Sequence, residues 1–123
     1  MLSLMLSITP NYPEYKFIVA GTKNVPIQYY NSICNKYNVK IVINDTYNLL
    51  SQAKAALVTS GTATLETALF NVPEVVCYKG SYISYHLAKL FVNIKYISLV
   101  NLIMDKKVVT ELIQDDITVS NLK

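Results

Sequence analysis

The segment Ala56–Glu66 (ALVTSGTATLE) decides the fold of this chain. Its first four residues form a short apolar run that is rich in β-forming residues, and Ser60 and Gly61 follow it at once. The next residues, Thr62–Phe70, place apolar side chains at helical spacing. A buried strand, a tight turn at a glycine and an amphipathic helix are the repeating unit of α/β proteins.

The same alternation continues on both sides of this segment. Four further short runs rich in Val and Ile predict strands: Tyr15–Ala20, Val39–Ile43, Val75–Tyr78 and Tyr96–Leu99. Segments with helical spacing lie between and beyond them: Ile27–Tyr37, Asn48–Lys54, Ser84–Asn93 and Val108–Gln114. Strands that alternate with helices predict one α/β domain over residues 1–123, with a Rossmann-like, doubly wound parallel sheet.

Composition excludes several classes of protein. Hydrophobic residues make up 52% of the 123 residues, which excludes intrinsic disorder. The net charge is only +3, and no basic run is longer than Lys106–Lys107, so the sequence argues against a nucleic-acid partner. The isolated cysteines, Cys34 and Cys77, and a single His cannot form a Cys/His zinc site, and they are typical of a reducing compartment.

The ends of the sequence and its apolar stretches bear on membrane contact. Met1–Ile8 lacks a basic n-region, so we interpret it as the end of a helix and not as a signal peptide. Leu87–Met104 is interrupted by Lys and Asn residues and does not predict a membrane span. Val119–Lys123 stops where a further helix is expected, and we therefore expect the domain to be truncated at both ends.

The strongest candidate site follows the strand Ala56–Thr59. Ligands of open parallel sheets bind beyond the carboxyl ends of the strands. There, Gly61 permits a tight turn, and the hydroxyls of Ser60 and Thr62 with the first free N–H groups of the helix can bind an anion. Glu66, one turn into the helix, can accept hydrogen bonds from two adjacent hydroxyls, such as those of a ribose. The alternative is an ordinary turn capped by Ser or Thr, with Glu66 exposed near the positive end of the helix.

A second candidate group lies near the carboxyl end of the chain. Asn101 follows the predicted strand Tyr96–Leu99, and Glu111 and Gln114 are three residues apart on a predicted helix, where they can converge on one polar ligand. The alternative is the solvated face of a short helix. Lys79 is a weaker candidate for a phosphate contact, and His86 is a weak candidate for a general base.

A resemblance to a known family rests on several blocks of sequence. Ser60–Glu66 (SGTATLE) resembles the donor-side motif of lipid-A-disaccharide synthases. Further blocks are similar to that family's segments in the same order: Tyr12–Gly21 (YPEYKFIVAG), Val72–Lys89 (VPEVVCYKGSYISYHLAK), Tyr96–Ile103 (YISLVNLI) and Val108–Asp116 (VVTELIQDD). Together they cover nearly the whole chain.

The resemblance implies the C-terminal, UDP-sugar donor-binding half of a GT-B glycosyltransferase. Such an enzyme transfers 2,3-diacylglucosamine from UDP to 2,3-diacylglucosamine 1-phosphate, with inversion, in lipid A biosynthesis at the cytoplasmic face of the inner membrane. By this resemblance the donor-nucleotide-binding residues are Ser60, Gly61, Thr62, Glu66, Asn101, Glu111 and Gln114. The first three would meet the diphosphate, Glu66 the ribose, and the last three the nucleotide sugar. The family implies neither a metal nor a cofactor.

This sequence also departs from the family. The family's Leu-Pro-Gly-Ser-Arg loop is expected before Met1, and the acceptor domain with the catalytic base is absent. Val100 and Thr110 stand where relatives carry Pro. We therefore expect no catalytic residue in this chain, an isolated chain that is inactive, and acceptor and membrane contacts through the absent domain. The alternatives are another UDP-sugar GT-B glycosyltransferase or epimerase, or a non-enzymatic α/β interaction domain.

Overall fold

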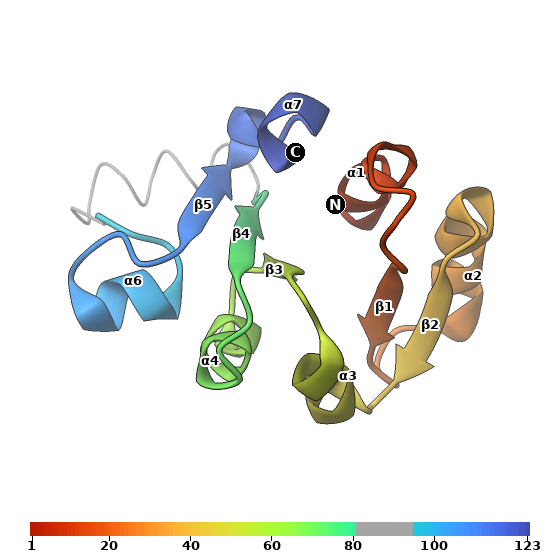
Figure 1. Cartoon of the computed structure of the whole chain (residues 1–123), viewed down its shortest axis with the longest axis horizontal. Coiled ribbons are helices and arrows are strands. Elements are labelled where there is room, and N and C mark those ends of the chain that lie inside the picture. Colours follow the sequence, from red (N-terminus) through yellow and green to blue (C-terminus); the bar gives the residue numbers. More distant parts are fainter. Residues whose placement is uncertain (81–94) are drawn as a thin grey trace.

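The computed structural model of the chain describes residues 1–80 and 95–123 and shows a mixed α/β fold (Figure 1). The helices are α1 (Leu2–Leu6), α2 (Ile27–Cys34), α3 (Thr46–Gln52), α4 (Thr62–Leu69), α6 (Leu99–Met104) and α7 (Val119–Leu122). The strands are β1 (Ile18–Gly21), β2 (Lys40–Ile43), β3 (Ala56–Thr59), β4 (Glu74–Tyr78) and β5 (Thr110–Ile113). Short 3-10 turns span Thr9–Asn11, Asn35–Tyr37 and Gln114–Asp116.

The prediction of parallel α/β structure is confirmed, and the first four strands and the helices between them lie where the sequence places them. Two element predictions near the carboxyl end are wrong. Tyr96–Leu99 is not a strand, because Ser98 accepts a hydrogen bond from the Asn101 N–H and caps α6. Val108–Gln114 is not a helix, because its β-branched residues favour the extended chain of β5. The helix expected over Ser84–Asn93 lies outside the described residues.

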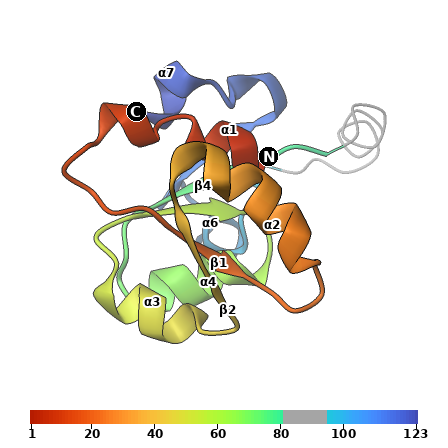
Figure 2. The ribbon, with the colours of Figure 1, turned by 90° about the vertical axis from the view of Figure 1, so that its right-hand side faces the viewer.

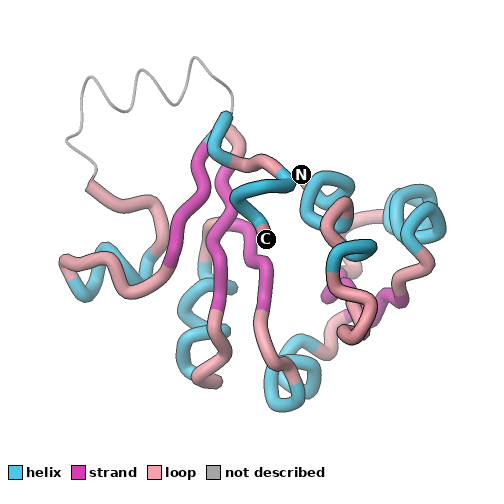
Figure 3. Tube along the Cα trace, turned by 45° about the horizontal axis from the view of Figure 1, so that its top comes forward, coloured by secondary structure: helices cyan, strands magenta, loops and turns pink. Residues whose placement is uncertain are grey.

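The strands of the described chain form two parallel sheets and not the single sheet that the sequence predicts. One sheet pairs β1 with β2, and the other has the order β3-β4-β5. Figure 3 shows three strands grouped on one side of the molecule and the other two strands on the other side. No hydrogen bond joins β1 to β3 in this part of the structure.

Each sheet has its own apolar cluster, and α1 contributes to both. Met5 and Ile8 pack with Cys77 and Leu112 of the three-stranded sheet, whereas Leu6 packs with residues of β1 and α2. Each fully buried side chain of this size contributes about 1.5–3 kcal/mol to stability. The amino-terminal helix therefore holds the two sheets together.

The helices are distributed at two ends of the molecule. Figures 1 and 2 place α3 and α4 at one end, and α1 and α7 at the opposite end. The Tyr12 hydroxyl donates a hydrogen bond to the Lys123 carbonyl, which ties the two chain ends together. Within the described ranges, none of the helices has the length and apolar content needed to cross a bilayer.

Candidate functional site

The turn between β3 and α4 presents free backbone N–H groups. Gly61 is the N-cap of α4 and has φ 148°, a conformation that side-chain-bearing residues rarely adopt. The alternative of a turn capped by Ser or Thr is not observed, because no side chain of the described residues makes a cap hydrogen bond to this helix. Thr64 Oγ1 instead donates to the Gly61 carbonyl at 2.8 Å. The first amides of α4 therefore remain open to an anion.

Glu66 lies one turn further along α4 and faces a shallow depression. The depression has a volume of about 340 Å³ and is lined by Asn44, Asp45, Thr46, Tyr47 and Glu66. The first two of these follow the carboxyl end of β2, so the hollow lies beyond the strand ends, where ligands of α/β folds bind. The role of Glu66 as a ribose contact stays a prediction.

Tyr47 is a functional candidate that sequence reasoning missed. Its hydroxyl donates to Glu66 Oε1 at 3.2 Å, and its ring lies 5.5 Å from the ring of Phe70. The side chain of Tyr47 is 59% exposed. Its position in the first turn of the helix after β2 could have identified it, because that turn follows the carboxyl end of a parallel strand, as Ser60 does. The sequence alone gave no sign that α3 and α4 approach each other.

The two candidate groups are linked through Ile97. Ser60 Oγ donates to the Ile97 carbonyl at 3.3 Å, and the Ile97 N–H donates to both carboxylate oxygens of Glu111 at 3.2 Å. Glu111 Oε1 also accepts from the Ser98 N–H at 2.8 Å. The segment before α6 therefore connects the turn at Ser60 with β5.

Asn101 is completely buried, and its amide is used within the fold. Its Oδ1 accepts from the N–H groups of Val108 and Val109 at 2.7 and 2.9 Å. Its Nδ2 donates to the Val109 carbonyl and to Glu111 Oε1, both at 2.9 Å. Asn101 and Glu111 therefore shape the loop between α6 and β5. Their direct contact with a ligand stays a prediction.

Gln114 follows the carboxyl end of β5 and differs from these two residues. Its Nε2 is buried and has no hydrogen-bond partner among the described residues, and its backbone has φ 53°. The argument that Glu111 and Gln114 share a helical face is wrong, because Glu111 lies in a strand. Gln114 nevertheless lies just after a strand end, as Ser60 does after β3.

The other candidates from the sequence contribute less. Lys79 is exposed after β4, and His86 lies outside the described residues. Within residues 1–80 and 95–123, no cluster of three His, Cys, Asp or Glu residues could hold a metal ion. Cys34 and Cys77 are free and buried, and burial raises the pKa of both thiols.

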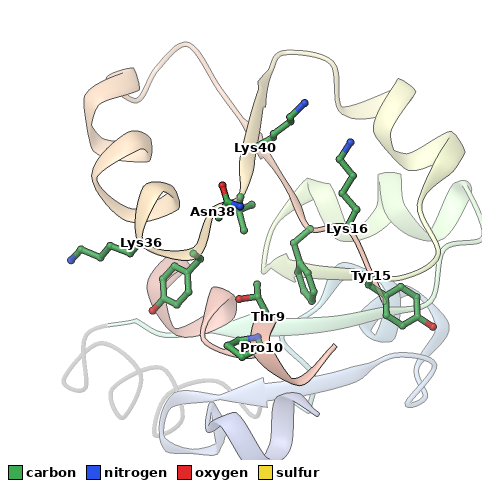
Figure 4. Close-up of a pocket in the computed structure, with 10 residues that line it drawn as sticks. Thr9, Pro10, Tyr15, Lys16, Lys36, Asn38 and Lys40 are labelled. Carbon is green, nitrogen blue, oxygen red and sulfur yellow. The ribbon is translucent and has the colours of Figure 1, made fainter. Parts of the chain in front are cut away.

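A larger depression of about 650 Å³ lies near the start of β1 and β2 (Figure 4). Lys16, Lys36 and Lys40 contribute to its lining. In Figure 4 the Lys36 side chain points away from the other two, so the three ammonium groups do not converge on one ligand. This hollow lies at the amino-terminal ends of the strands, opposite to the edge where α/β folds bind ligands.

The fold and the site define a parallel α/β protein with an open helix N-terminus and a carboxylate beyond its strand ends. A sequence profile described as lipid-A-disaccharide synthetase matches residues 4–123. The chain belongs to the lipid-A-disaccharide synthase family. This finding confirms the family resemblance seen in the sequence.

Individual relatives agree with this assignment. The chain is 40% identical over 119 residues to the lipid-A-disaccharide synthase of Psychromonas ingrahamii. The aligned region covers 94% of this chain and 31% of the relative. It is 46% identical over 81 residues to that of Acidobacterium capsulatum, covering 66% of this chain and 20% of the relative. It is 33% identical over 115 residues to that of Persephonella marina, and the aligned region covers 94% of this chain and 28% of the relative. The chain thus spans less than a third of the length of these relatives.

Proposed function

We propose that this chain is the UDP-sugar donor-binding part of a lipid-A-disaccharide synthase, in the C-terminal half of a GT-B fold. The reaction is transfer of 2,3-diacylglucosamine from UDP to 2,3-diacylglucosamine 1-phosphate. The single observation that carries the proposal is the uncapped N-terminus of α4, with Glu66 one turn beyond it at a polar hollow. The family membership supports the same conclusion.

The diphosphate of the donor binds at the turn before α4. Its charge is favoured by the helix dipole and by the free N–H groups that follow Gly61. Because UDP leaves as an anion, the same groups stabilise charge that develops during transfer. Thr62 and Glu66 are one helical turn apart, about 6 Å along the axis. This spacing supports a contact of the carboxylate with the ribose when the diphosphate lies at the helix end.

Glu66 accepts hydrogen bonds from the ribose hydroxyls. Its Oε1 already accepts one hydrogen bond from Tyr47, which holds the carboxylate at the edge of the hollow. Among the described residues the Gln114 Nε2 group has no hydrogen-bond partner, and at the end of β5 it can meet the nucleotide sugar. Asn101 and Glu111 influence donor binding indirectly, because their hydrogen bonds hold the segment that contacts Ser60.

The catalytic base and the acceptor site belong to the portion of the family that this chain does not span. The chain by itself is therefore inactive in disaccharide formation. Contact with the lipid acceptor and with the cytoplasmic face of the inner membrane comes from that same portion. No metal or cofactor is part of the proposal.

A calorimetric titration of the chain with UDP tests this proposal. We expect saturable binding that Glu66→Ala weakens about tenfold, as loss of hydrogen bonds to a charged group of this kind does. Glu14→Ala is the matched control, because it removes an exposed carboxylate in the segment before β1. Absence of saturable UDP binding, or equal effects of both variants, would contradict the proposal. Affinity for every nucleoside diphosphate alike would favour a binding module without donor specificity.

A further inference from the structure

Seven consecutive residues, Leu102–Val108 (LIMDKKV), are all exposed. They form the end of α6 and the start of the loop that leads to β5, and we call them the α6 tip. Its large apolar members Leu102, Ile103, Met104 and Val108 are 45%, 68%, 52% and 49% exposed. Single apolar side chains on a protein surface are normal, whereas a group of them marks a surface that binds a partner.

Hydrogen bonds behind the α6 tip hold it in a fixed shape. The helix ends at Asp105, whose φ of 47° turns the chain away from the helix axis. The Asn101 Oδ1 atom accepts from the N–H groups of Val108 and Val109 at 2.7 and 2.9 Å and so closes the loop. Because Asn101 is fully buried, this closure is part of the fold. The exposed apolar side chains therefore belong to a built loop.

The position of the α6 tip leaves it accessible to a large partner. Figure 1 places α6 and the chain after it at the periphery of the molecule, on the side away from β1 and β2. The two hollows described above are lined by residues outside the tip. A projecting loop of this kind suits contact with a broad surface and does not enclose a small molecule.

The charges of the α6 tip indicate the chemistry of that surface. Lys106 and Lys107 are exposed between Met104 and Val108. The single acidic residue of the tip, Asp105, has its Oδ1 atom 3.7 Å from Lys95 Nζ, so a third cation offsets its charge. Apolar side chains beside ammonium groups match the boundary of an anionic bilayer, where acyl chains meet the former and phosphates the latter.

We infer that the α6 tip docks on an anionic phospholipid bilayer. Ile103 and Met104 enter the boundary between headgroups and acyl chains, and Lys106 and Lys107 extend their ammonium groups to the phosphates. This contact is additional to the one that the proposed function assigns to the portion of the family that this chain does not span. Two ammonium groups and a few apolar side chains give weak, reversible binding, and stable attachment takes a second contact.

The inference can be tested apart from the proposed function. The α6 tip includes none of the residues that line the hollow at Glu66, and it lies beyond Asn101 along the chain. Titration with UDP therefore reports on the donor site, and binding to lipid vesicles reports on the tip.

Vesicle flotation of the full chain measures the docking. The probes are vesicles of phosphatidylcholine with one third phosphatidylglycerol, and vesicles of phosphatidylcholine alone. We expect binding to the mixed vesicles that is about tenfold stronger or more and that falls as salt is added. Joint replacement Lys106→Gln and Lys107→Gln should weaken it about twentyfold, because each lysine near an anionic surface contributes about fivefold. Lys36→Gln with Lys40→Gln is the matched control and should change binding little.

A fluorescent side chain gives a second readout, because the sequence contains no Trp. Ile103→Trp should shift its emission to shorter wavelength on the mixed vesicles and should be quenched by brominated acyl chains. Ile27→Trp, at a site in α2 that is 45% exposed, should do neither. Both replaced side chains are exposed, so both variants should fold.

Three results would overturn the inference. The first is no binding to the mixed vesicles, or equal losses in the two pairs of lysine variants, since net charge alone would then account for binding. The second is bound Ile103→Trp chain whose emission stays unshifted. The third is a concentration-dependent shift of Ile103→Trp without vesicles, because a second copy of the chain would then cover the tip.

Discussion

Asn101 Nδ2 donates a hydrogen bond to Glu111 Oε1 at 2.9 Å, and this contact joins α6 to β5 in the interior. Glu111 in turn accepts from the N–H groups of Ile97 and Ser98, and Ile97 accepts from Ser60. Two residues that the sequence predicts as ligand contacts therefore hold the segment that packs beside the turn at Ser60. Such a network makes the geometry of the site depend on residues that are themselves buried.

Asn101→Ala should destabilise the chain substantially. The variant leaves the N–H groups of Val108 and Val109 without their acceptor and removes one donor to Glu111. The expected loss of unfolding free energy is about 3 kcal/mol, as unsatisfied buried groups cost about 1–3 kcal/mol each. Urea unfolding measures it. Asn31→Ala on the exposed face of α2 is the control and should change stability by no more than about 0.5 kcal/mol. Equal losses of unfolding free energy in the two variants would show that the hydrogen bonds of Asn101 add nothing to stability.

The stability of the chain should depend on the ionisation of Glu74. This residue is 8% exposed, and neither carboxylate oxygen has a hydrogen-bond partner among the described residues. Desolvation by burial raises the pKa of Glu74 from 4.5 to about 7. The folded state therefore binds more protons than the unfolded state between these pH values. The stabilising contribution is complete below pH 4.5 and is lost as pH rises through about 7.

Unfolding experiments across that pH range check the effect. The free energy of unfolding should fall by on the order of 2 kcal/mol as pH rises across this range. Glu74→Gln should remove most of this pH dependence. Glu14→Gln, at an exposed position, should keep the full pH dependence. If Glu74→Gln keeps the same slope of unfolding free energy against pH, a group other than Glu74 causes the pH dependence.

Gly61→Ala should reduce stability although the new side chain meets no atom. A Cβ at Gly61 has nothing within 4 Å, but φ 148° is unfavourable for any residue with a side chain. We expect a cost of about 1–3 kcal/mol, measured by thermal or urea unfolding. Thr62→Ala, at an exposed first helical position, is the control and should have a small effect. A Gly61→Ala chain of unchanged stability would mean that the turn relaxes to an ordinary φ.

Tyr47→Phe should weaken UDP binding without loss of stability. The variant removes the hydroxyl that bonds Glu66 Oε1 and keeps the ring beside Phe70. The hydroxyl positions the carboxylate and is not proposed to touch UDP, so we expect an affinity that is about two- to fivefold lower. Tyr29→Phe is the matched control, because Tyr29 lies in α2 and is similarly exposed at 53%. Titration calorimetry with UDP measures the affinity of both variants. An unchanged affinity of Tyr47→Phe would show that Tyr47 does not contribute to UDP binding.

Much of the local structure could be predicted because it depends on neighbours in sequence. The strand Ala56–Thr59 has the predicted bounds, and the next helix begins at Thr62 as predicted and ends at Leu69, one residue early. An apolar run, a glycine and helical spacing each act over a few residues. The region from Tyr96 to Gln114 was predicted wrongly. There, the cap at Ser98 and the pairing of β5 with β4 override the local pattern of apolar residues.

The sequence by itself determined the α/β class, the family and the turn at Gly61 before an amphipathic helix. These follow from short-range preferences and from blocks of matching residues. Only the tertiary structure decided that Tyr47 meets Glu66, that Asn101 and Glu111 are satisfied internally, and that the described strands form two parallel sheets. Those relationships join residues far apart along the chain, and their free energy depends on packing and hydrogen-bond partners that no local pattern specifies.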